Sequence, residues 1–186
     1  MIIAISGTPG TGKTTASKLL AKKINANFIR IRDIIHEIPY EIDKKRDTFI
    51  VDVKDLQKLI NKKLKKGGNI VEGHLSHLLD VDLVIILRTN PSMLEKRLKA
   101  KKWKKPKIDE HIKAEILDSA TIEALELHGR KKVFEIDTSK LRPEQAAGAM
   151  ETILNNFRRK RYLHKYTAGK IDWTEKYEKY LVGGKR

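Results

Sequence analysis

Residues 7–14 read Gly-Thr-Pro-Gly-Thr-Gly-Lys-Thr, and no other stretch of the chain predicts the fold as specifically. They match the pattern G-x-x-x-x-G-K-[ST], whose glycines let the backbone turn its N–H groups inward around phosphate oxygens. An apolar run at residues 2–6 precedes the motif as a buried strand does, and an amphipathic helix is expected over residues 14–24. This order indicates a phosphate-binding loop, because the positive dipole end of the helix then faces the same anion.

The motif assigns a role to each polar residue at the end of this loop. Lys13 is expected to reach the β- and γ-phosphates, the Thr14 hydroxyl to hold Mg²⁺, and Thr15 to donate to the α-phosphate. Gly10 and Gly12 shape the backbone that surrounds the phosphates. The predicted ligands are therefore ATP or ADP with Mg²⁺, and a glycine-rich turn that fits the pattern by chance is the alternative.

Apolar runs and helical periodicities alternate along the rest of the chain. Further strands are expected at residues 28–31, 69–71, 83–87 and 133–136. Helices are expected from Asp52 to the Gly67-Gly68 pair, over residues 90–98, 109–128 and 143–157, with a short helix and a loop within residues 33–51. This alternation predicts an α/β fold: a P-loop NTPase with about five mostly parallel strands and helices on both faces of the sheet.

Length and composition limit the classes of protein that the chain can belong to. It has 186 residues, of which 40% are hydrophobic, which is enough for one domain with a core. It contains no cysteine, which excludes disulfides, thiolate catalysis and cysteine-bound zinc. No apolar stretch approaches the roughly 20 residues of a membrane span, and the first ten residues lack the basic region of a secretory signal. We therefore expect a cytoplasmic protein without a membrane partner.

The formal charge of +16 is concentrated in two stretches. Residues 96–107 carry eight basic and no acidic side chains, and residues 157–186 carry ten basic and three acidic ones. Such patches suit the phosphates of a nucleotide or a nucleic acid, and a heat-adapted surface is the alternative. The apolar rhythm stops near residue 157, so we expect a domain over 1–157 and a basic, aromatic-rich C-terminal extension over 158–186.

Aromatic residues accumulate in the same C-terminal part of the chain. Cations interleaved with aromatic rings suit single-stranded RNA, because phosphates meet Lys and Arg while bases stack on the rings. The alternative is that the aromatic side chains pack on the body of the protein and leave the lysines in solvent. The residues concerned are Phe157, Tyr162, Tyr166, Trp173, Tyr177 and Tyr180.

A carboxylate, Glu72, follows the expected strand at residues 69–71. In a parallel α/β sheet the carboxyl ends of the strands face the ligand, so Glu72 can hold Mg²⁺ through water or orient an attacking water. His74 lies two residues further on, and a histidine in such a loop is often only a hydrogen-bonding residue.

Three motifs together, GTPGTGKTT at residues 7–15, E-x-H at residues 72–74 and LRTNPSMLEKRL at residues 87–98, resemble one family. This is the family of atypical adenylate kinases of the isoform-six type, and the resemblance covers about residues 1–157. It implies a nucleoside monophosphate kinase with ATPase activity that also acts in small-ribosomal-subunit assembly and rRNA maturation. The implied partners are a nucleoside monophosphate acceptor, ribosomal RNA and a small-subunit ribosomal protein.

The resemblance also implies roles for residues around the phosphate loop. It has Asp-x-His where this chain has Glu72 and His74, so both become candidate catalytic residues and Glu72 a water-mediated Mg²⁺ ligand. Residues 97–108 correspond to a mobile cationic lid, in which Arg97 matches a lid arginine and Lys101 replaces an arginine that contacts ATP. Trp103, within the same run, either stacks on a base or anchors the lid to the body.

The acceptor side departs from the family pattern. The segment at about residues 30–53 corresponds to the part that binds the acceptor nucleotide, and Asp33 is present there. The family has an arginine three residues later, where this chain has His36, which cannot make the bidentate grip of a guanidinium. Arg30 or Arg32 can substitute for it. A small P-loop kinase with a non-nucleotide acceptor, and an ATPase switch with incidental kinase turnover, therefore remain alternatives to the adenylate kinase.

Overall fold

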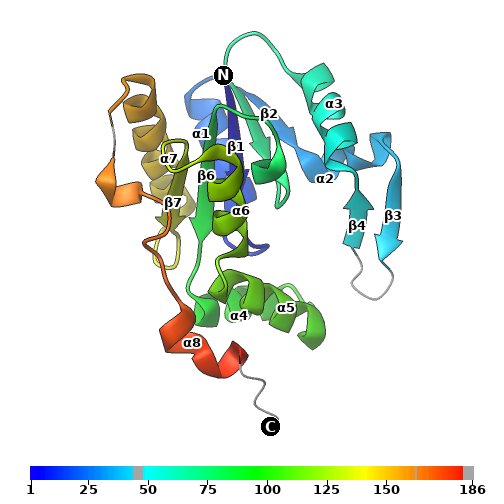
Figure 1. Ribbon diagram of the computed structural model, residues 1–186, viewed down its shortest axis with the longest axis vertical. Coiled ribbons are helices and arrows are strands. Elements are labelled where there is room, and N and C mark those ends of the chain that lie inside the picture. The colour runs from blue at the N-terminus through cyan, green and yellow to red at the C-terminus, as the bar shows by residue number, and fades with distance from the viewer. Residues whose placement is uncertain (44–47, 162, 182–186) are drawn as a thin grey trace.

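The computed structural model describes residues 1–43, 48–161 and 163–181, and at its centre is a five-stranded sheet (Figure 1). Its strands lie in the order β2-β5-β1-β6-β7, and every neighbouring pair is parallel. This confirms the predicted P-loop NTPase fold of the α/β class. The strands are β1 (Ile2–Ser6), β2 (Asn27–Arg30), β5 (Asn69–Glu72), β6 (Leu83–Arg88) and β7 (Val133–Asp137).

Helices cover both faces of this sheet. Alternate residues of β1 point to opposite faces, so Ile3 and Ile5 belong to one apolar core and Ala4 to the other. The first core packs against α1 (Lys13–Lys23) and α7 (Pro143–Arg158), and the second packs against α3 (Val53–Lys63) and α6 (Ser119–His128). Strands buried on both sides explain the continuous apolar runs in the sequence.

Side-chain caps fix where two of the helices begin. The Asp52 carboxylate accepts from the backbone N–H of Lys54 at 2.6 Å, one position inside the start of α3. The Asn90 side chain likewise accepts from the N–H of Ser92 at 3.1 Å, at the start of α4 (Pro91–Ala100). These caps satisfy N–H groups that have no partner within the helix, and the cap at Asp52 is the one that the sequence predicted.

The acceptor segment contains a hairpin that the sequence interpretation missed. The expected short helix is present as α2 (Ile31–Ile34) and the 3₁₀ turn η1 (Ile35–Glu37). Instead of a loop, β3 (Tyr40–Asp43) and β4 (Thr48–Val51) then pair antiparallel. The hairpin was missed because its apolar side chains do not mark a buried face, since Ile42 and Ile50 are both more than half exposed.

The single helix expected over residues 109–128 is wrong. The structure has two helices, α5 (Lys105–Ile116) and α6, separated by a break at Asp118, whose φ is 54°. The apolar periodicity runs across this break, so it gave no sign of it. Asp118 adopts the left-handed conformation and its carboxylate pairs with the guanidinium of Arg88, a tertiary contact that helical periodicity cannot reveal.

The C-terminal segment packs on the body through a third apolar core. Its elements are the 3₁₀ turn η3 (His164–Tyr166) and α8 (Thr174–Leu181), which lies beside α4 and α5 in Figure 1. Tyr177 is buried against residues of α4 and α5, and Trp103 and Trp173 are partly buried against the same core. These contacts agree with the packing alternatives for Trp103, Trp173 and Tyr177.

The other C-terminal aromatic residues fall into three groups. Phe157 and Tyr166 pack against the core beneath α1 and α7, whereas Tyr180 is exposed. Tyr162 lies outside the described residues. Within the described part of the chain, no helix combines the length and the apolar character needed to cross a membrane.

We expect Tyr177→Phe to lower the free energy of unfolding by about 1–2 kcal/mol. The Tyr177 hydroxyl donates to the Asn90 side-chain oxygen at 2.6 Å and lies 2.9 Å from the Ser92 hydroxyl, so the substitution removes both of these partly buried contacts. Urea denaturation measures the change. The matched control is Tyr180→Phe, whose exposed hydroxyl contact should be worth less than about 0.5 kcal/mol. Equal losses for the two variants would contradict the anchoring role.

Candidate functional site

The loop at residues 7–12 follows the carboxyl end of β1 and is held against β6 and α4. A Cβ atom on Gly7, whose φ is 124°, would lie 2.2 Å from the carbonyl oxygen of Leu87. A Cβ atom on Gly10 would lie 2.8 Å from the Leu94 side chain. Both positions therefore require glycine, and the backbone of the loop is held in close contact with β6 and α4. At Gly12 the same Cβ would meet no atom within 4 Å, so this part of the loop is open.

Lys13, the first residue of α1, is buried and turned back over this loop. Its Nζ donates to the carbonyl oxygens of Gly7 at 2.6 Å and Thr8 at 3.0 Å. Burial lowers the pKa of Lys13 to about 8, while the nearby carboxylates of Glu72 and Glu115 oppose that shift. The side chain therefore stays mostly protonated at pH 7. It is placed to leave these carbonyl oxygens and bind the anionic oxygens of a phosphate instead.

Thr14 and Glu72, the two residues predicted to hold Mg²⁺, are in contact. The Thr14 hydroxyl donates to a Glu72 carboxylate oxygen at 3.2 Å, and Glu72 is only 4% exposed at the end of β5. Burial raises the pKa of Glu72, and the positive charge of Lys13 and the Thr14 hydrogen bond oppose the rise. Hydroxyl and carboxylate oxygens suit Mg²⁺, which keeps several water ligands. In residues 1–43, 48–161 and 163–181, no group of three or more His, Cys, Asp or Glu side chains is arranged to hold a metal by itself.

The start of α1 adds backbone donors to the same place. The first N–H groups of a helix, here those of Lys13, Thr14 and Thr15, have no partner within the helix and carry its positive dipole end. An open loop, a buried ammonium group, these N–H groups and the Thr14–Glu72 oxygen pair fit a nucleotide's phosphates with Mg²⁺.

His74 lies in the loop after β5, and its side chain is exposed. Desolvation, followed by the positive charge of Lys13, lowers the pKa of His74 to about 4. The backbone carbonyl of His74 accepts from the Ser6 hydroxyl at 3.2 Å, which ties this loop to the end of β1. A neutral imidazole at pH 7 can accept a proton or orient water.

On the acceptor side, the structure separates the two candidate arginines. Arg30 stands opposite Glu72 in the sheet register, and its Nε donates to the Asp33 carboxylate at 2.9 Å. The side chains of Arg32 and His36 are exposed on α2 and the following turn. Arg30 is therefore the candidate that the sheet brings to the edge where Glu72 lies.

On the lid side, Arg97 reaches back to the phosphate loop. One of its guanidinium nitrogens donates to the Thr138 carbonyl at 3.0 Å, and the other to the Thr89 hydroxyl at 3.2 Å and the Gly10 carbonyl at 3.4 Å. Lys101 is in the turn after α4, and its charge is among those that lower the pKa of Lys13. The two predicted lid cations therefore lie on the side of the loop next to α4.

Sequence reasoning missed His111, which lies on α5 with its ring centre 5.3 Å from that of Trp103. Its Nε2 is buried and has no hydrogen-bond partner in the described part of the chain. Burial and the charges of Lys107 and Lys13 lower its pKa, while Glu110 opposes the shift. A histidine inside a helical pattern carries no signal in the sequence that distinguishes it from a surface residue.

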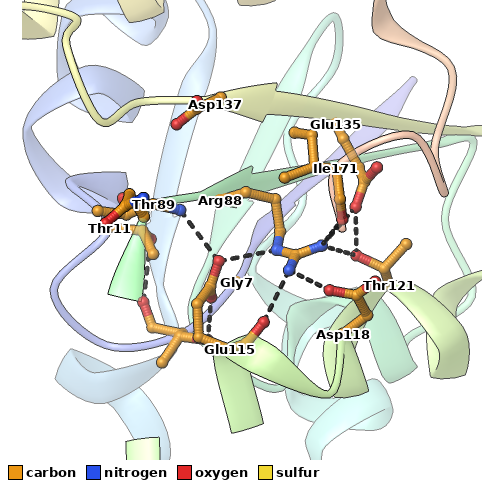
Figure 2. Close-up of polar contacts among 12 residues, drawn as sticks. Gly7, Thr11, Arg88, Thr89, Glu115, Asp118, Thr121, Glu135, Asp137 and Ile171 are labelled. Carbon is orange, nitrogen blue, oxygen red and sulfur yellow. Dashed lines mark hydrogen bonds and ion pairs between the residues drawn. The ribbon is translucent and has the colours of Figure 1, made fainter. Parts of the chain in front are cut away.

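The second omission is a buried ionic cluster centred on Arg88, at the end of β6 (Figure 2). Arg88 Nε donates to Glu115 at 2.8 Å, one Nη donates to Glu135 at 2.8 Å, and the other pairs with Asp118. Burial alone disfavours the charged guanidinium, but the three carboxylates raise the pKa of Arg88 above its ordinary value. The arginine stood in the quoted LRT motif, but its three partners are far away in the sequence.

This cluster touches the phosphate loop directly. One oxygen of Glu115 accepts from the Thr8 hydroxyl at 2.5 Å, and the other accepts from the Thr89 N–H at 3.0 Å. Figure 2 shows the Glu115 carboxylate between the Thr89 backbone and the Arg88 guanidinium. The phosphate loop is therefore bonded to α5, the helix that begins within the predicted lid.

The parallel sheet and the loop at its carboxyl edge define a P-loop protein of the nucleotide-binding class. A family model described as "AAA domain" matches residues 3–118. Proteins named "Putative adenylate kinase" are 38% identical in Pyrococcus furiosus (97% of this chain, 96% of the relative) and 39% identical in Thermococcus kodakarensis (97% of each). The protein of that name in Methanocaldococcus jannaschii is 38% identical over 98% of each chain. The chain belongs to this family of adenylate-kinase-like P-loop proteins.

We expect Asp118→Asn to flatten the dependence of stability on pH. Burial raises the pKa of Asp118 to about 6, opposed by Arg88 and reinforced by Glu135 and Glu115. Because its ordinary pKa is near 4, folding takes up a proton between about pH 4 and pH 6. The stability contributed by this proton is complete below pH 4 and is lost as the pH rises through 6.

Urea denaturation from pH 4 to pH 7 checks this expectation. As the pH rises from 4 to 7, the free energy of unfolding of Asp118→Asn should increase relative to that of the wild type. The increase should reach up to about 3 kcal/mol, at about 1.4 kcal/mol per pH unit. The exposed carboxylate of Asp80, outside the cluster, provides the control variant Asp80→Asn, whose curve should run parallel to the wild type. A parallel curve for Asp118→Asn as well would show that Asp118 does not carry the raised pKa.

Proposed function

We propose that this protein is an ATP-dependent nucleoside monophosphate kinase of the adenylate kinase type. The observation that carries the proposal is the convergence of Lys13, Thr14 and Glu72 beside an open phosphate loop at one edge of the sheet. The names of the archaeal relatives support the same activity.

Transfer to a nucleoside monophosphate requires positioning and neutralisation of charge more than it requires a base. The acceptor phosphate is already ionised near pH 7, so it needs no strong general base. Mg²⁺, when bound, supplies positive charge at the transferred phosphoryl group. Thr14 is the residue that we assign to Mg²⁺ directly, and Glu72 holds it through water. Lys13 leaves the Gly7 and Thr8 carbonyls and binds the β- and γ-phosphates.

On the acceptor side we assign Arg30 as the cation for the acceptor phosphate. It stands opposite Glu72, and Asp33 fixes its orientation through a 2.9 Å hydrogen bond. The exposed His36 takes no part in this assignment. A kinase with a non-nucleotide acceptor remains the second candidate, because the arginine that the family has at the position of His36 is missing.

The same site supports ATP hydrolysis when water replaces the acceptor. A neutral His74, with a pKa lowered to about 4, can orient that water, and so can the carboxylate of Glu72. The lid at residues 97–108, with Arg97 and Lys101, closes over the phosphates and limits this side reaction by excluding water.

We expect Lys13→Ala to reduce ATP turnover at least about 100-fold, because it removes a cation from the transferred phosphates. The matched control is Lys18→Ala on the exposed side of α1, which should leave turnover unchanged. The assay follows labelled ATP with a panel of monophosphates and without any acceptor. Labelled diphosphate made from AMP identifies the adenylate kinase. If no monophosphate changes the rate of ATP turnover, the non-nucleotide acceptor or the ATPase switch would be favoured. Unchanged turnover in Lys13→Ala would overturn the assignment of this site.

We further propose that the chain acts in small-ribosomal-subunit assembly, contacting ribosomal RNA and a small-subunit ribosomal protein. The supporting observation is that α8 packs on α4 and α5, which brings the exposed lysines of α8, Lys176 and Lys179, to the end of the molecule where α4 and α5 lie (Figure 1). Removing the C-terminal segment is a poor test of this role, because the segment also covers the third apolar core.

Charge substitutions give the cleaner test of RNA binding. The triple variant Lys102/Lys104/Lys105→Gln should lower the slope of log affinity against log salt by about 2 for a single-stranded RNA. The control is Arg130/Lys131/Lys132→Gln, three exposed cations before the amino end of β7. Fluorescence anisotropy of a labelled oligonucleotide measures both slopes. Equal slopes for the two variants would argue against an RNA surface at the lid.

A further inference from the structure

We propose that Glu115 is a positioning residue for the phosphate loop and that it acts through the hydroxyl of Thr8. This inference rests on the proposed function only in taking the loop as the place where a nucleotide's phosphates bind. It concerns a residue on α5 that lies outside the nucleotide-binding motif and outside the predicted lid.

Thr8 occupies the centre of the hydrogen bonds within the loop. Its carbonyl accepts from Lys13 Nζ at 3.0 Å and from the Thr11 hydroxyl at 2.9 Å. Its own hydroxyl points the other way and donates to Glu115 at 2.5 Å. Whatever fixes the Thr8 side chain therefore also fixes the carbonyl against which Lys13 rests.

Glu115 is itself immobile and has its charge compensated. It is only 1% exposed, and the carboxylate oxygen that does not meet Thr8 accepts from Arg88 Nε at 2.8 Å and from the Thr89 N–H at 3.0 Å. Three donors satisfy this buried carboxylate, and a charged acceptor holds a donor more strongly than a neutral acceptor does. Glu115 therefore holds the Thr8 hydroxyl in a fixed position, which a mobile surface side chain could not do.

Arg88 links the Glu115 carboxylate to the rest of the molecule. Its guanidinium also contacts Glu135, Asp118, Thr121 and, at 3.4 Å, the Ile171 carbonyl of the C-terminal segment (Figure 2). Glu135 in turn accepts from the backbone N–H of Gly169 at 2.7 Å. Moving Glu115 would therefore break its contacts with Arg88 and Thr89, and Arg88 cannot follow it without losing its own contacts to β7, α6 and the C-terminal segment.

The experiment compares Thr8→Val, which keeps the shape but removes the hydroxyl, with Thr8→Ser, which keeps the hydroxyl. Titration calorimetry with ADP is the first measurement, and hydrogen exchange of the loop at residues 7–12 in the nucleotide-free protein is the second. Thr8→Val should bind ADP about 10-fold more weakly, the size of one hydrogen bond to a charged group, and its loop should exchange faster. Thr8→Ser should stay within about twofold of the wild type in affinity.

A double-mutant cycle with Glu115→Gln assigns the effect to this pair. If Glu115 is the group through which Thr8 acts, Thr8→Val should change ADP affinity less than about twofold in the Gln background. Should Glu115→Gln fail to fold, the comparison of Val with Ser at position 8 decides alone.

Three results would overturn the inference. One is a Thr8→Val protein that binds ADP as the wild type does, even if it melts at a lower temperature, since that shows a structural role only. Another is a Thr8→Ser protein as weak as Thr8→Val. A wild-type chain that binds no ADP would remove the proposed function and this inference together, which separates that failure from the first two.

Discussion

The buried charge of Arg88 is the constraint on which much of this structure depends. A guanidinium that is 2% exposed must be neutralised where it lies, because removing one partner of a buried ion pair typically costs about 3–5 kcal/mol. Its charged partners come from α5, from the break between α5 and α6, and from β7, and its last contact is a carbonyl of the C-terminal segment. Meeting this requirement fixes how five parts of the chain are placed around the carboxyl end of β6.

The phosphate loop makes use of that arrangement. It leaves β1 at the same edge of the sheet, with Gly7 against the Leu87 carbonyl and Gly10 against Leu94. Glu115 then links it to the ionic cluster through Thr8. The loop is therefore preorganised by sterics on one side and by a charge-assisted hydrogen bond on the other, and preorganisation of this kind reduces the cost of binding an anion.

The C-terminal segment takes part in the same architecture. It buries Tyr177 against α4 and α5, and it places backbone N–H groups of Gly169 and Lys170 on Glu135. The alignments with the archaeal relatives span 97–98% of this chain, so they extend beyond the family model that ends at residue 118. Segment 163–181 combines this packing with exposed lysines: on α8, Tyr177 is buried whereas Lys176 and Lys179 are exposed.

The sequence by itself determined the parallel sheet, the loop and most of the helices, because each depends on contacts between near neighbours. A five-residue apolar run, glycines at fixed spacing and capping residues such as Asp52 and Asn90 act locally. Only the tertiary structure decided the break at Asp118, the pairing of β3 with β4 and the partners of Arg88 and Thr8. Asp118 lies 30 residues from Arg88, and Glu115 lies 107 residues from Thr8. Charges paired across such distances leave no periodic trace, because the fold alone brings them within reach of each other.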